Sequence, residues 1–576
     1  MKKKNTITFA LIFVLILSIG TAYYIKQNKT EKLKENNNIK NTNQLDKNIN
    51  LDNGDEKIDW SLLDSSILNL NNKSVTITKE GTYTLSGKIN NGNITVNTTG
   101  DVKLILDSVS IKSNNSPAII IEQANNTVIE LKENTINTLK DSTTYDNTEY
   151  DGCLFSRDDL IIQGTGTLNI TSNYLDAIVS NDDLKIVDGT YIINSNDDGI
   201  RGKDSVNIQN GNFTINSQSD AIKSTNDAES GKGYINIDNG TFTIESRQDA
   251  LQAETKLIIN NGTFDIKTGD GSSSKTSAIY KDFYNGTSYD TTSTKALKSN
   301  DNLIINNGTI TIDSQDDAIH SNNYVGIKNG TINITSGDNG IHADTEIIID
   351  GGNINIKKSY EGIESNDITI NDGEISITSN DDGINISGGN DSSSIGGRPG
   401  ENPMYSSSFG ILTINNGKIY VNADGDGLDA NGSIIINNGK LYVDGPTKGG
   451  NGTLDYDRSF NINGGTVIAV GSSDMAQSPS TSSTQNSLMF YLSTSYNNKE
   501  IIIEDENGNE IISYIPKKTY SSIIISSKKI REGKTYTLKI DNKKITSLTP
   551  SSIITTDGQS NGPSGNHHPG GPGPRR

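Results

Sequence analysis

The sequence has little that would support a disulfide-linked, basic or helical protein. Its single cysteine, Cys153, cannot form an internal disulfide, so no cross-linked framework is expected. Lys and Arg number 50 against 70 Asp and Glu, a net charge of −20, which argues against nucleic acid or anionic lipid as a partner. Proline is scarce, and apolar residues rarely recur at helical spacing. The remaining composition, rich in Asn, Asp, Ser, Thr, Gly and Ile, is typical of a long all-β protein.

A three-residue step recurs along most of the chain: an acidic or amide residue, a small residue and an apolar residue. In "SNDDGIRGKDSVNIQNGNFTINSQSDAIKS", Asp198-Gly199-Ile200 returns as Asp220-Ala221-Ile222, 22 positions later. The first residues of the steps are Asp176, Asp198, Asp220, Asp249, Asp317, Asn339, Glu361, Asp382 and Asp426. Longer intervals coincide with insertions at about 225–233, 271–294 and 387–409, which leave the other units in register.

Within each unit the apolar residues alternate, as in β-strands. Leu303 and Ile305 precede an Asn-Gly pair, and Ile310 and Ile312 follow it. Asn-Gly suits the left-handed backbone of tight corners and recurs in most units. Each unit is therefore predicted to contain a strand, a corner, a second strand, another corner and a short third strand. Cys153, in "DGCLFS", stands where other units place an apolar residue, so it is predicted to lie in the core.

A unit of about 22 residues predicts one coil of a right-handed parallel β-helix, whose coils stack about 4.8 Å apart. A β-propeller blade would need about 40 residues. The small residue of the step is expected to prevent crowding against the neighbouring coil, and the acidic residue is expected to point outward.

The ends of the chain differ from the repeats. Lys2 to Lys4 precede an apolar run from about Ile7 to Ile25, which predicts export by a signal peptide or by an uncleaved membrane anchor, and hence an extracellular or cell-surface protein. The expected organisation is residues 1–25 signal peptide or anchor, 26–56 disordered linker, 57–150 N-terminal cap and first coils, 151–470 parallel β-helix, 487–549 C-terminal β module and 557–576 disordered Gly/Pro tail. His567 and His568 in that tail are weak metal candidates.

Stacking aligns the acidic steps into columns with carboxylates about 5 Å apart, whose repulsion a hard cation such as Ca²⁺ would relieve. The candidate metal ligands form three clusters: Asp176, Asp197, Asp198, Asp204 and Asp220 with Asp182; Asp316, Asp317 and Asp338 with Asn339 and Asp344; and Glu361, Asp381, Asp382, Asp424, Asp426 and Asp429. The alternative is that these carboxylates hydrate an acidic surface or cap backbone amides at the corners.

The "DDGI" and "DAI" steps, the export signal, and "YIPKKTYSSIIISS" followed by "GKTYTL" together resemble the carbohydrate-binding β-helix family of clostridia. That family is similar in architecture to the calcium-dependent pectate lyases of polysaccharide lyase family nine. Over about residues 57–549, the resemblance implies a right-handed β-helix, bound Ca²⁺ and affinity for plant cell wall polysaccharides, cellulose or pectic acid sugars. It does not imply lyase turnover.

Three classes of function remain open from the residues. A monomeric polysaccharide-binding protein would meet uronates with Ca²⁺ or with local cations and would stack neutral sugars on aromatic rings; the candidates are Arg201, Lys223, Lys298, Tyr280, Phe283, Tyr284 and Tyr289. A pectate lyase acting by β-elimination would need a base of lowered pKa, for which Lys223 and Lys298 are the candidates. The third class is an exported structural or adhesive protein without a sugar ligand.

Overall fold

The computed structural model describes residues 58–273, 292–387 and 409–559. The chain divides into two compact units, Met1–Ile58 and Asp59–Arg576, and almost all described residues belong to the second. These residues form no α-helix, only the 3₁₀ turn Trp60–Leu62, so the described part offers no helix that could span a membrane. The apolar run of residues 7–25 lies outside the described residues.

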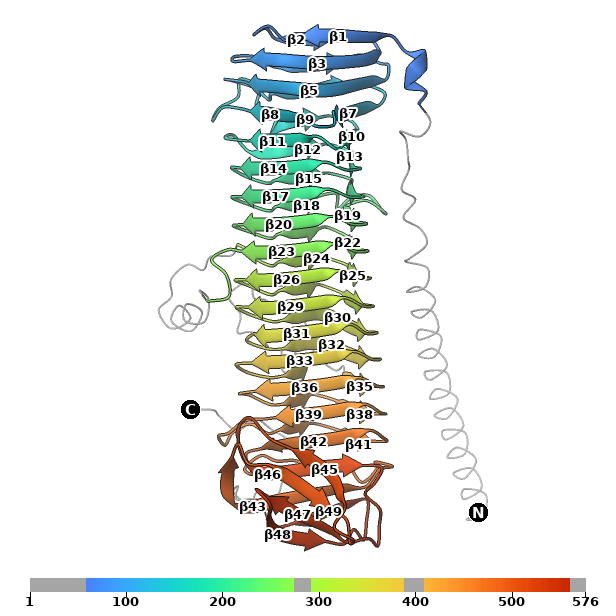
Figure 1. Ribbon diagram of the computed structural model, residues 1–576, viewed down its shortest axis with the longest axis vertical. Coiled ribbons are helices and arrows are strands. Elements are labelled where there is room, and N and C mark those ends of the chain that lie inside the picture. Colours follow the sequence, from blue (N-terminus) through green and yellow to red (C-terminus); the bar gives the residue numbers. More distant parts are fainter. Residues whose placement is uncertain (1–57, 274–291, 388–408, 560–576) are drawn as a thin grey trace, which may run out of the picture. The chain divides into compact units, whose positions relative to one another are not determined.

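The second unit is an all-β stack, consistent with a solenoid (Figure 1). Most strands belong to one 45-stranded sheet. Equivalent strands of successive repeats pair in parallel and in register, so that Ile200 aligns with Ile222, and Ile222 with Leu251. The predicted order of strands within a unit is confirmed: most repeats add one strand to each of three faces.

The first face, named here the step face, carries the short strands that follow the acidic steps. Its strands are β2 (Val75–Ile77), β4 (Ile94–Asn97), β6 (Ile119–Gln123), β9 (Gly152–Ser156), β12 (Asp176–Ser180), β15 (Ile200–Gly202), β18 (Ile222–Ser224), β21 (Leu251–Ala253), β24 (Leu297–Ser299), β27 (Ile319–Ser321), β34 (Ile384–Ile386), β37 (Leu428–Ala430) and β40 (Leu454–Tyr456). Two longer strands, β30 (Ile341–Ile349) and β32 (Ile363–Ile370), continue from this face into the second face.

The second face precedes the Asn-Gly corner, and the third face follows it. The second face contains β7 (Thr127–Leu131), β10 (Leu160–Gly164), β13 (Asp183–Ile186), β16 (Ser205–Ile208), β19 (Tyr234–Ile237), β22 (Lys256–Ile259), β25 (Asn302–Ile305), β28 (Tyr324–Ile327), β35 (Ile411–Ile414), β38 (Ser433–Ile436) and β41 (Ser459–Ile462). The third face contains β8 (Ile136–Lys140), β11 (Thr167–Thr171), β14 (Thr190–Ser195), β17 (Asn212–Ser217), β20 (Thr241–Ser246), β23 (Thr263–Thr268), β26 (Thr309–Ser314), β29 (Thr331–Ser336), β31 (Asn353–Lys358), β33 (Glu374–Ser379), β36 (Lys418–Ala423), β39 (Lys440–Asp444) and β42 (Thr466–Gly471).

The core lies inside the three faces, because alternate residues of each strand point inward. Four rings of the third face, Tyr191, Phe213, Phe242 and Phe264, stack with centroids 4.6–4.8 Å apart and are at most 2% exposed. Cys153 is fully buried, which confirms its predicted place in the core.

The small residue of the step has the predicted role. A Cβ at Gly199 would lie 2.6 Å from the backbone oxygen of Ala221 in the next repeat. Because backbone atoms cannot give way as the end of a flexible side chain can, the step admits only a small residue at this point.

The ends of the stack differ. At the N-terminal end, β1 (Ser65–Asn69), β3 (Gly81–Ile89) and β5 (Val102–Lys112) extend the parallel pairing, and Ile67 in β1 is 82% exposed. At the other end, β46 (Thr519–Ser527) pairs antiparallel with β42 and with β43 (Ser487–Asn497), which also pairs with β49 (Ile554–Asp557). A separate antiparallel sheet contains β45 (Glu510–Tyr514), β44 (Ile501–Glu504), β47 (Tyr536–Ile540) and β48 (Lys543–Leu548). The antiparallel β46 thus covers the edge of the third face.

Candidate functional site

Two columns of side chains run along the step face. The step column is formed by the first residue of each step: Asp176, Asp198, Asp220, Asp249, Lys295, Asp317, Asn339, Glu361, Asp382 and Asp426. The partner column is formed by the residue three positions later, which lies in register from repeat to repeat: Val179, Arg201, Lys223, Gln252, Lys298, His320, His342, Glu364, Asn385 and Asp429. The period of the sequence therefore brings most of the predicted site residues together on one face.

The carboxylates of the step column are largely buried. Asp176, Asp198 and Asp220 are 2–5% exposed. Asp176 accepts a hydrogen bond from the backbone N–H of Asp198 at 3.0 Å, and Asp198 accepts one from the N–H of Asp220 at 3.0 Å. Each carboxylate satisfies an amide of the following repeat, and these contacts accompany its low exposure. The alternative hypothesis of amide capping is confirmed here.

Basic side chains of the partner column neutralise the first part of the step column. The Nε atom of Arg201 donates to Asp176 Oδ2 at 2.7 Å, and Arg201 also pairs with Asp151. Lys223 Nζ lies 2.7 Å from Asp220 Oδ2. Burial nevertheless raises the pKa of Asp176 and of Asp220 to about 7, and neighbouring carboxylates add to the rise.

Lys298 repeats this arrangement further along. Its Nζ donates to Asp249 Oδ2 at 3.1 Å. Arg201, Lys223 and Lys298, the predicted contacts for acidic sugars, thus each hold a carboxylate of their own protein. Burial lowers the pKa of Lys223, but Asp220 and Asp198 outweigh it, so the pKa lies above the ordinary lysine value. Such a lysine stays protonated at neutral pH and is poorly suited to remove a proton in β-elimination.

The remaining residues of the first predicted cluster separate into two groups. Asp197 lies with Asp176 and Asp198, with ligand oxygens within 4.8 Å of one another. Asp182 belongs to a second group with Asp159 and Asp183, and its side chain is hydrogen-bonded to that of Asp204. Asp204 pairs with Lys232 and accepts a hydrogen bond from Asn226 at 2.6 Å. The cluster is therefore not one site.

A buried lysine occupies the step column in the middle of the stack. Lys295 is 3% exposed, and its Nζ lies 3.1 Å from Asp316 Oδ2 and 3.2 Å from Asp317 Oδ2. His320 Nδ1 lies 2.8 Å from the same Asp317 oxygen. Against the effect of burial, Lys295 and His320 hold the pKa of Asp317 well below its usual range. Sequence reasoning missed Lys295, although Lys295-Ala296-Leu297 has the small and apolar residues of a step.

The next repeat joins an amide, an imidazole and two acids. Asn339 Nδ2 donates to Glu364 Oε2 at 2.6 Å, and His342 Nδ1 lies 3.1 Å from that oxygen. The other ring nitrogen of His342 lies 3.0 Å from Asp344 Oδ1. Asp338 is grouped with Asp316 and Asp317. This second predicted cluster therefore contains its own cationic group, Lys295.

The third predicted cluster contains a group of three neighbouring carboxylates. Asp382, Asp426 and Asp429 bring carboxylate oxygens within 4.8 Å of one another and are partly exposed. Burial and the neighbouring carboxylates raise the pKa of Asp382 to about 9 and that of Asp429 to about 8. Burial also raises the pKa of Glu361 well above its usual value. The surroundings of this cluster therefore favour the protonated form of these carboxyl groups.

Two of these carboxylates also accept hydrogen bonds from backbone amides: Asp382 Oδ1 from the N–H of Asp426 at 2.6 Å, and Asp426 Oδ1 from the N–H of Gly452. Asn385 is buried, and its Oδ1 has no hydrogen-bond partner, whereas its Nδ2 donates to Glu361 at 3.1 Å. A Cβ at Gly425 would lie 2.4 Å from oxygens of both Asp381 and Asp382, so a larger residue at this position would crowd the two carboxylates. Asp424, also predicted here, is exposed and instead pairs with Lys518 at 2.6 Å.

The charge of the partner column therefore changes along the stack. From Arg201 to His342 the partner column is mostly basic, but it then continues as Glu364, Asn385 and Asp429. Within residues 58–273, 292–387 and 409–559, no lysine or arginine forms an ion pair with Asp382 or Asp429. These oxygen donors can hold a metal ion, and the group at Asp382, Asp426 and Asp429 is the candidate metal centre.

Six predicted site residues cannot be placed. Tyr280, Phe283, Tyr284 and Tyr289, the predicted sugar-stacking rings, and the tail residues His567 and His568 lie outside the described residues.

The fold and site define a repetitive all-β protein with a candidate metal centre on one face. The family model of carbohydrate-binding domain-containing proteins matches residues 71–340 and 338–383, more than half of the chain. The chain belongs to this family.

Two similar proteins are bacterial relatives with partial coverage of this chain. A carbohydrate-binding domain-containing protein of Acetivibrio thermocellus is 34% identical over 135 residues, which are 22% of this chain and 47% of the relative. The chain thus spans about half the length of this curated relative. A solved structure, described as a polysaccharide lyase-like protein from C. thermocellum in a gadolinium derivative, is 33% identical and covers 36% of this chain and 91% of its own, with a TM-score of 0.35.

Proposed function

We propose that the protein is an extracellular carbohydrate-binding protein that recognises plant cell wall polysaccharides, cellulose, pectic acid sugars or both, and that holds Ca²⁺ at Asp382, Asp426 and Asp429. The observation that carries the proposal is the change in the partner column. Where Lys223 contacts the carboxylates of Asp198 and Asp220, the equivalent positions near Asp382 are Asn385 and Asp429. A cation from solution replaces the missing side-chain charge.

Calcium fits the donors better than a softer metal. Ca²⁺ takes six to eight oxygen ligands, from carboxylates, amide carbonyls and water, with little demand on geometry. The three carboxylates supply such oxygens, and Asn385, in register with Asp429, has a buried Oδ1 without a hydrogen-bond partner. The group contains no thiol or imidazole, which zinc and copper prefer.

The ion also explains how an acidic protein would hold an acidic polymer. With a net charge of −20, the protein repels polygalacturonate unless a cation lies between them. Asp382, Asp426 and Asp429 are partly exposed, so an ion bound there has room for ligands from solution. A uronate carboxylate would complete its coordination.

The proposal extends to fold, family and location. Parallel pairing between successive repeats supports a right-handed parallel β-helix of the clostridial carbohydrate-binding type, similar to polysaccharide lyase family nine. The basic start and the apolar run of residues 7–25 support a location outside the cytoplasmic membrane, with the protein secreted or anchored by that run. A monomeric state is part of the proposal.

Calorimetric titration of the metal-free full-length chain with CaCl₂, combined with affinity electrophoresis in polygalacturonate, tests the proposal. The double variant Asp382→Asn/Asp429→Asn should lose most of its Ca²⁺ affinity and its retardation by polygalacturonate. The matched control is Asp265→Asn, an exposed carboxylate of the third face. Chelation should abolish the retardation of the wild type.

Other results would overturn the proposal. Unchanged Ca²⁺ binding in the double variant would show that the ion does not bind at Asp382 and Asp429. Retardation that persists after chelation would show that Ca²⁺ does not bridge the protein and polygalacturonate. Unsaturated product, detected as ultraviolet absorbance during incubation with polygalacturonate, would make the protein a lyase instead.

A further inference from the structure

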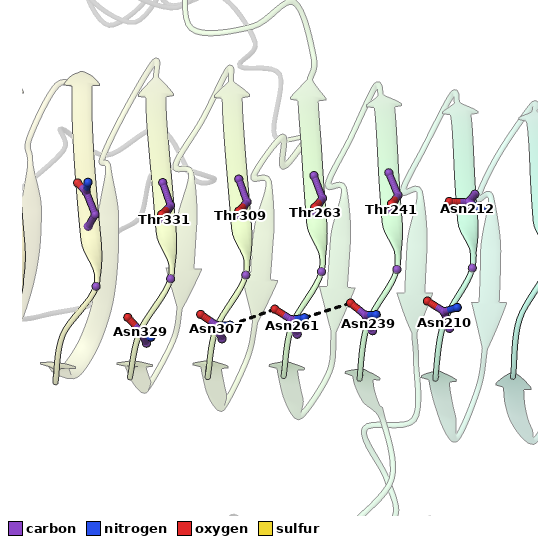
Figure 2. Close-up of a pocket in the computed structure, with 17 residues that line it drawn as sticks. Asn210, Asn212, Asn239, Thr241, Asn261, Thr263, Asn307, Thr309, Asn329 and Thr331 are labelled. Carbon is purple, nitrogen blue, oxygen red and sulfur yellow. Dashed lines mark hydrogen bonds between the residues drawn. The ribbon is translucent and has the colours of Figure 1, made fainter.

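A second surface feature lies where the third-face strands begin, at the opposite end of these strands from the acidic steps. At the corners between the second and third faces, a groove of about 680 Å³ runs along the stack over six repeats. Asn239, Asn261 and Asn307 belong to one wall, and Thr241 and Thr263 to the other; Figure 2 shows the two rows side by side. The groove is separate from the metal centre, which lies on the step face.

Glycine forms the floor of the groove for a structural reason. Gly240 and Gly262 have φ of 136° and 131°, a backbone region that favours glycine. A Cβ at Gly262 would also lie 3.0 Å from the backbone oxygen of Gly240. Stacking therefore requires the glycines, and their missing side chains leave the depression. They do not by themselves make it a binding site.

The walls retain hydrogen-bonding capacity. Asn261 Nδ2 donates to Asn239 Oδ1 at 3.2 Å, and Asn307 Nδ2 donates to Asn261 Oδ1 at 3.1 Å. A side-chain amide has two donors and two lone pairs, so Asn261 keeps one of each for a ligand. In the described part of the chain, the exposed hydroxyls of Thr241 and Thr263 bond to no protein atom.

The groove is also free of charge. Every residue that lines it is Asn, Gly or Thr, although the whole chain carries a net charge of −20. A neutral polymer can therefore approach without repulsion, whereas the groove offers a polyanion no counter-charge.

We propose that this groove binds a linear, uncharged polysaccharide that runs along the stack, with one sugar ring for each repeat. Successive repeats are about 4.8 Å apart, close to the advance of one ring along an extended β-linked chain. Each ring then meets one amide and one threonine hydroxyl, which exchange hydrogen bonds with its hydroxyl groups. The inference rests on the proposed carbohydrate-binding function and assigns its neutral ligand to a site separate from the metal centre.

Titration of the full-length chain with cello-oligosaccharides of increasing length tests the site. Affinity should rise with each added ring and level off once the oligomer spans the six repeats of the groove. The triple variant Thr241→Val/Thr263→Val/Thr309→Val keeps the side-chain shape and a high β-propensity. It should bind the longest oligomer about tenfold more weakly or worse, because three hydrogen bonds are lost.

The matched control is Thr214→Val/Thr243→Val/Thr311→Val. These threonines are exposed on the same face but do not line the groove, so this variant should bind like the wild type. Equal losses in both triple variants, no loss in the first, or affinity independent of length would each overturn the assignment. Thermal melting of both variants checks that they fold.

The two proposals fail separately. Asp382→Asn/Asp429→Asn and chelation should leave oligosaccharide binding unchanged, because neither alters the groove. If chelation abolishes both oligosaccharide and polygalacturonate binding, the metal centre is the sole sugar site and the groove assignment fails. If oligosaccharides bind as expected but Ca²⁺ does not bind, only the calcium proposal fails.

Discussion

The carboxylate of Asp198 and the backbone amide of Asp220, one repeat later, form a hydrogen bond of 3.0 Å in the protein interior. The same bond joins Asp176 to Asp198 and Asp220 to Asp249. These acidic residues therefore connect the repeats, and Asp176 and Asp220 also form ion pairs with Arg201 and Lys223.

Replacing Asp198 tests this connection. Asp198→Ala leaves the N–H of Asp220 buried without its acceptor, so the free energy of unfolding should fall by about 1–3 kcal/mol. Asp198→Asn keeps an oxygen in place and should cost less. Urea denaturation followed by circular dichroism measures both, with the exposed Asp265→Ala as the control. A loss in Asp198→Ala no larger than in the control would contradict the connecting role.

The metal-free protein should lose stability as pH rises. The pKa values of Asp382, about 9, and Asp429, about 8, lie above the ordinary value of 3.8. The folded state therefore binds protons that the unfolded state has released, and this contribution to stability is lost as pH rises through the folded-state values. Melting temperatures without metal should fall from about pH 5 to about pH 9, more steeply in the wild type than in Asp382→Asn/Asp429→Asn. Equal slopes would contradict the raised pKa values.

Calcium should release protons when it binds. The ion requires deprotonated carboxylates, and at neutral pH Asp382 and Asp429 are mostly protonated according to the same pKa values. Calorimetric titration in buffers of different ionisation enthalpy should therefore show proton release, and Ca²⁺ affinity should increase with pH. Binding heats that do not depend on the buffer would argue against this centre.

Chelation should act through the third cluster. At a free Ca²⁺ concentration of 100 times Kd, the ion stabilises the folded state by about 2.7 kcal/mol, so EDTA should lower the melting temperature. Asp382→Asn should reduce that shift. Asp198→Asn should preserve it, because Lys223 already lies near the Asp198 carboxylate. If Asp198→Asn reduces the shift in melting temperature and Asp382→Asn preserves it, the ion binds at the first cluster instead.

Lys295 should contribute strongly to the stability of the folded protein. Lys295→Met leaves the carboxylates of Asp316 and Asp317 buried without this cation, and breaking a buried ion pair in this way costs about 3–5 kcal/mol. Chemical denaturation measures the loss against Lys267→Met, an exposed position of the third face. A variant as stable as that control would show that His320 alone compensates the two acids.

Much of the fold could be predicted because it depends on local patterns repeated at a fixed interval. Alternating apolar residues define strands, Asn-Gly marks the corners, and a step that returns after 22 residues places Asp198 beside Asp220 in any stack of such units. The need for a small residue at Gly199 follows from the same stacking. The cation-bearing residue Lys295 was missed because only acidic and amide residues were counted as steps.

The sequence by itself determined the period, the strands and the alignment of the acidic residues into columns, since these follow from spacing alone. Only the tertiary structure decided which carboxylates have a counter-charge. That outcome depends on side chains from different repeats reaching one oxygen, as Arg201 reaches Asp176 and Lys295 reaches Asp316. Spacing places the backbone of each repeat, but the reach of a side chain and its burial fix the charge balance, and this balance makes Asp382 and Asp429 candidate ligands for a metal ion.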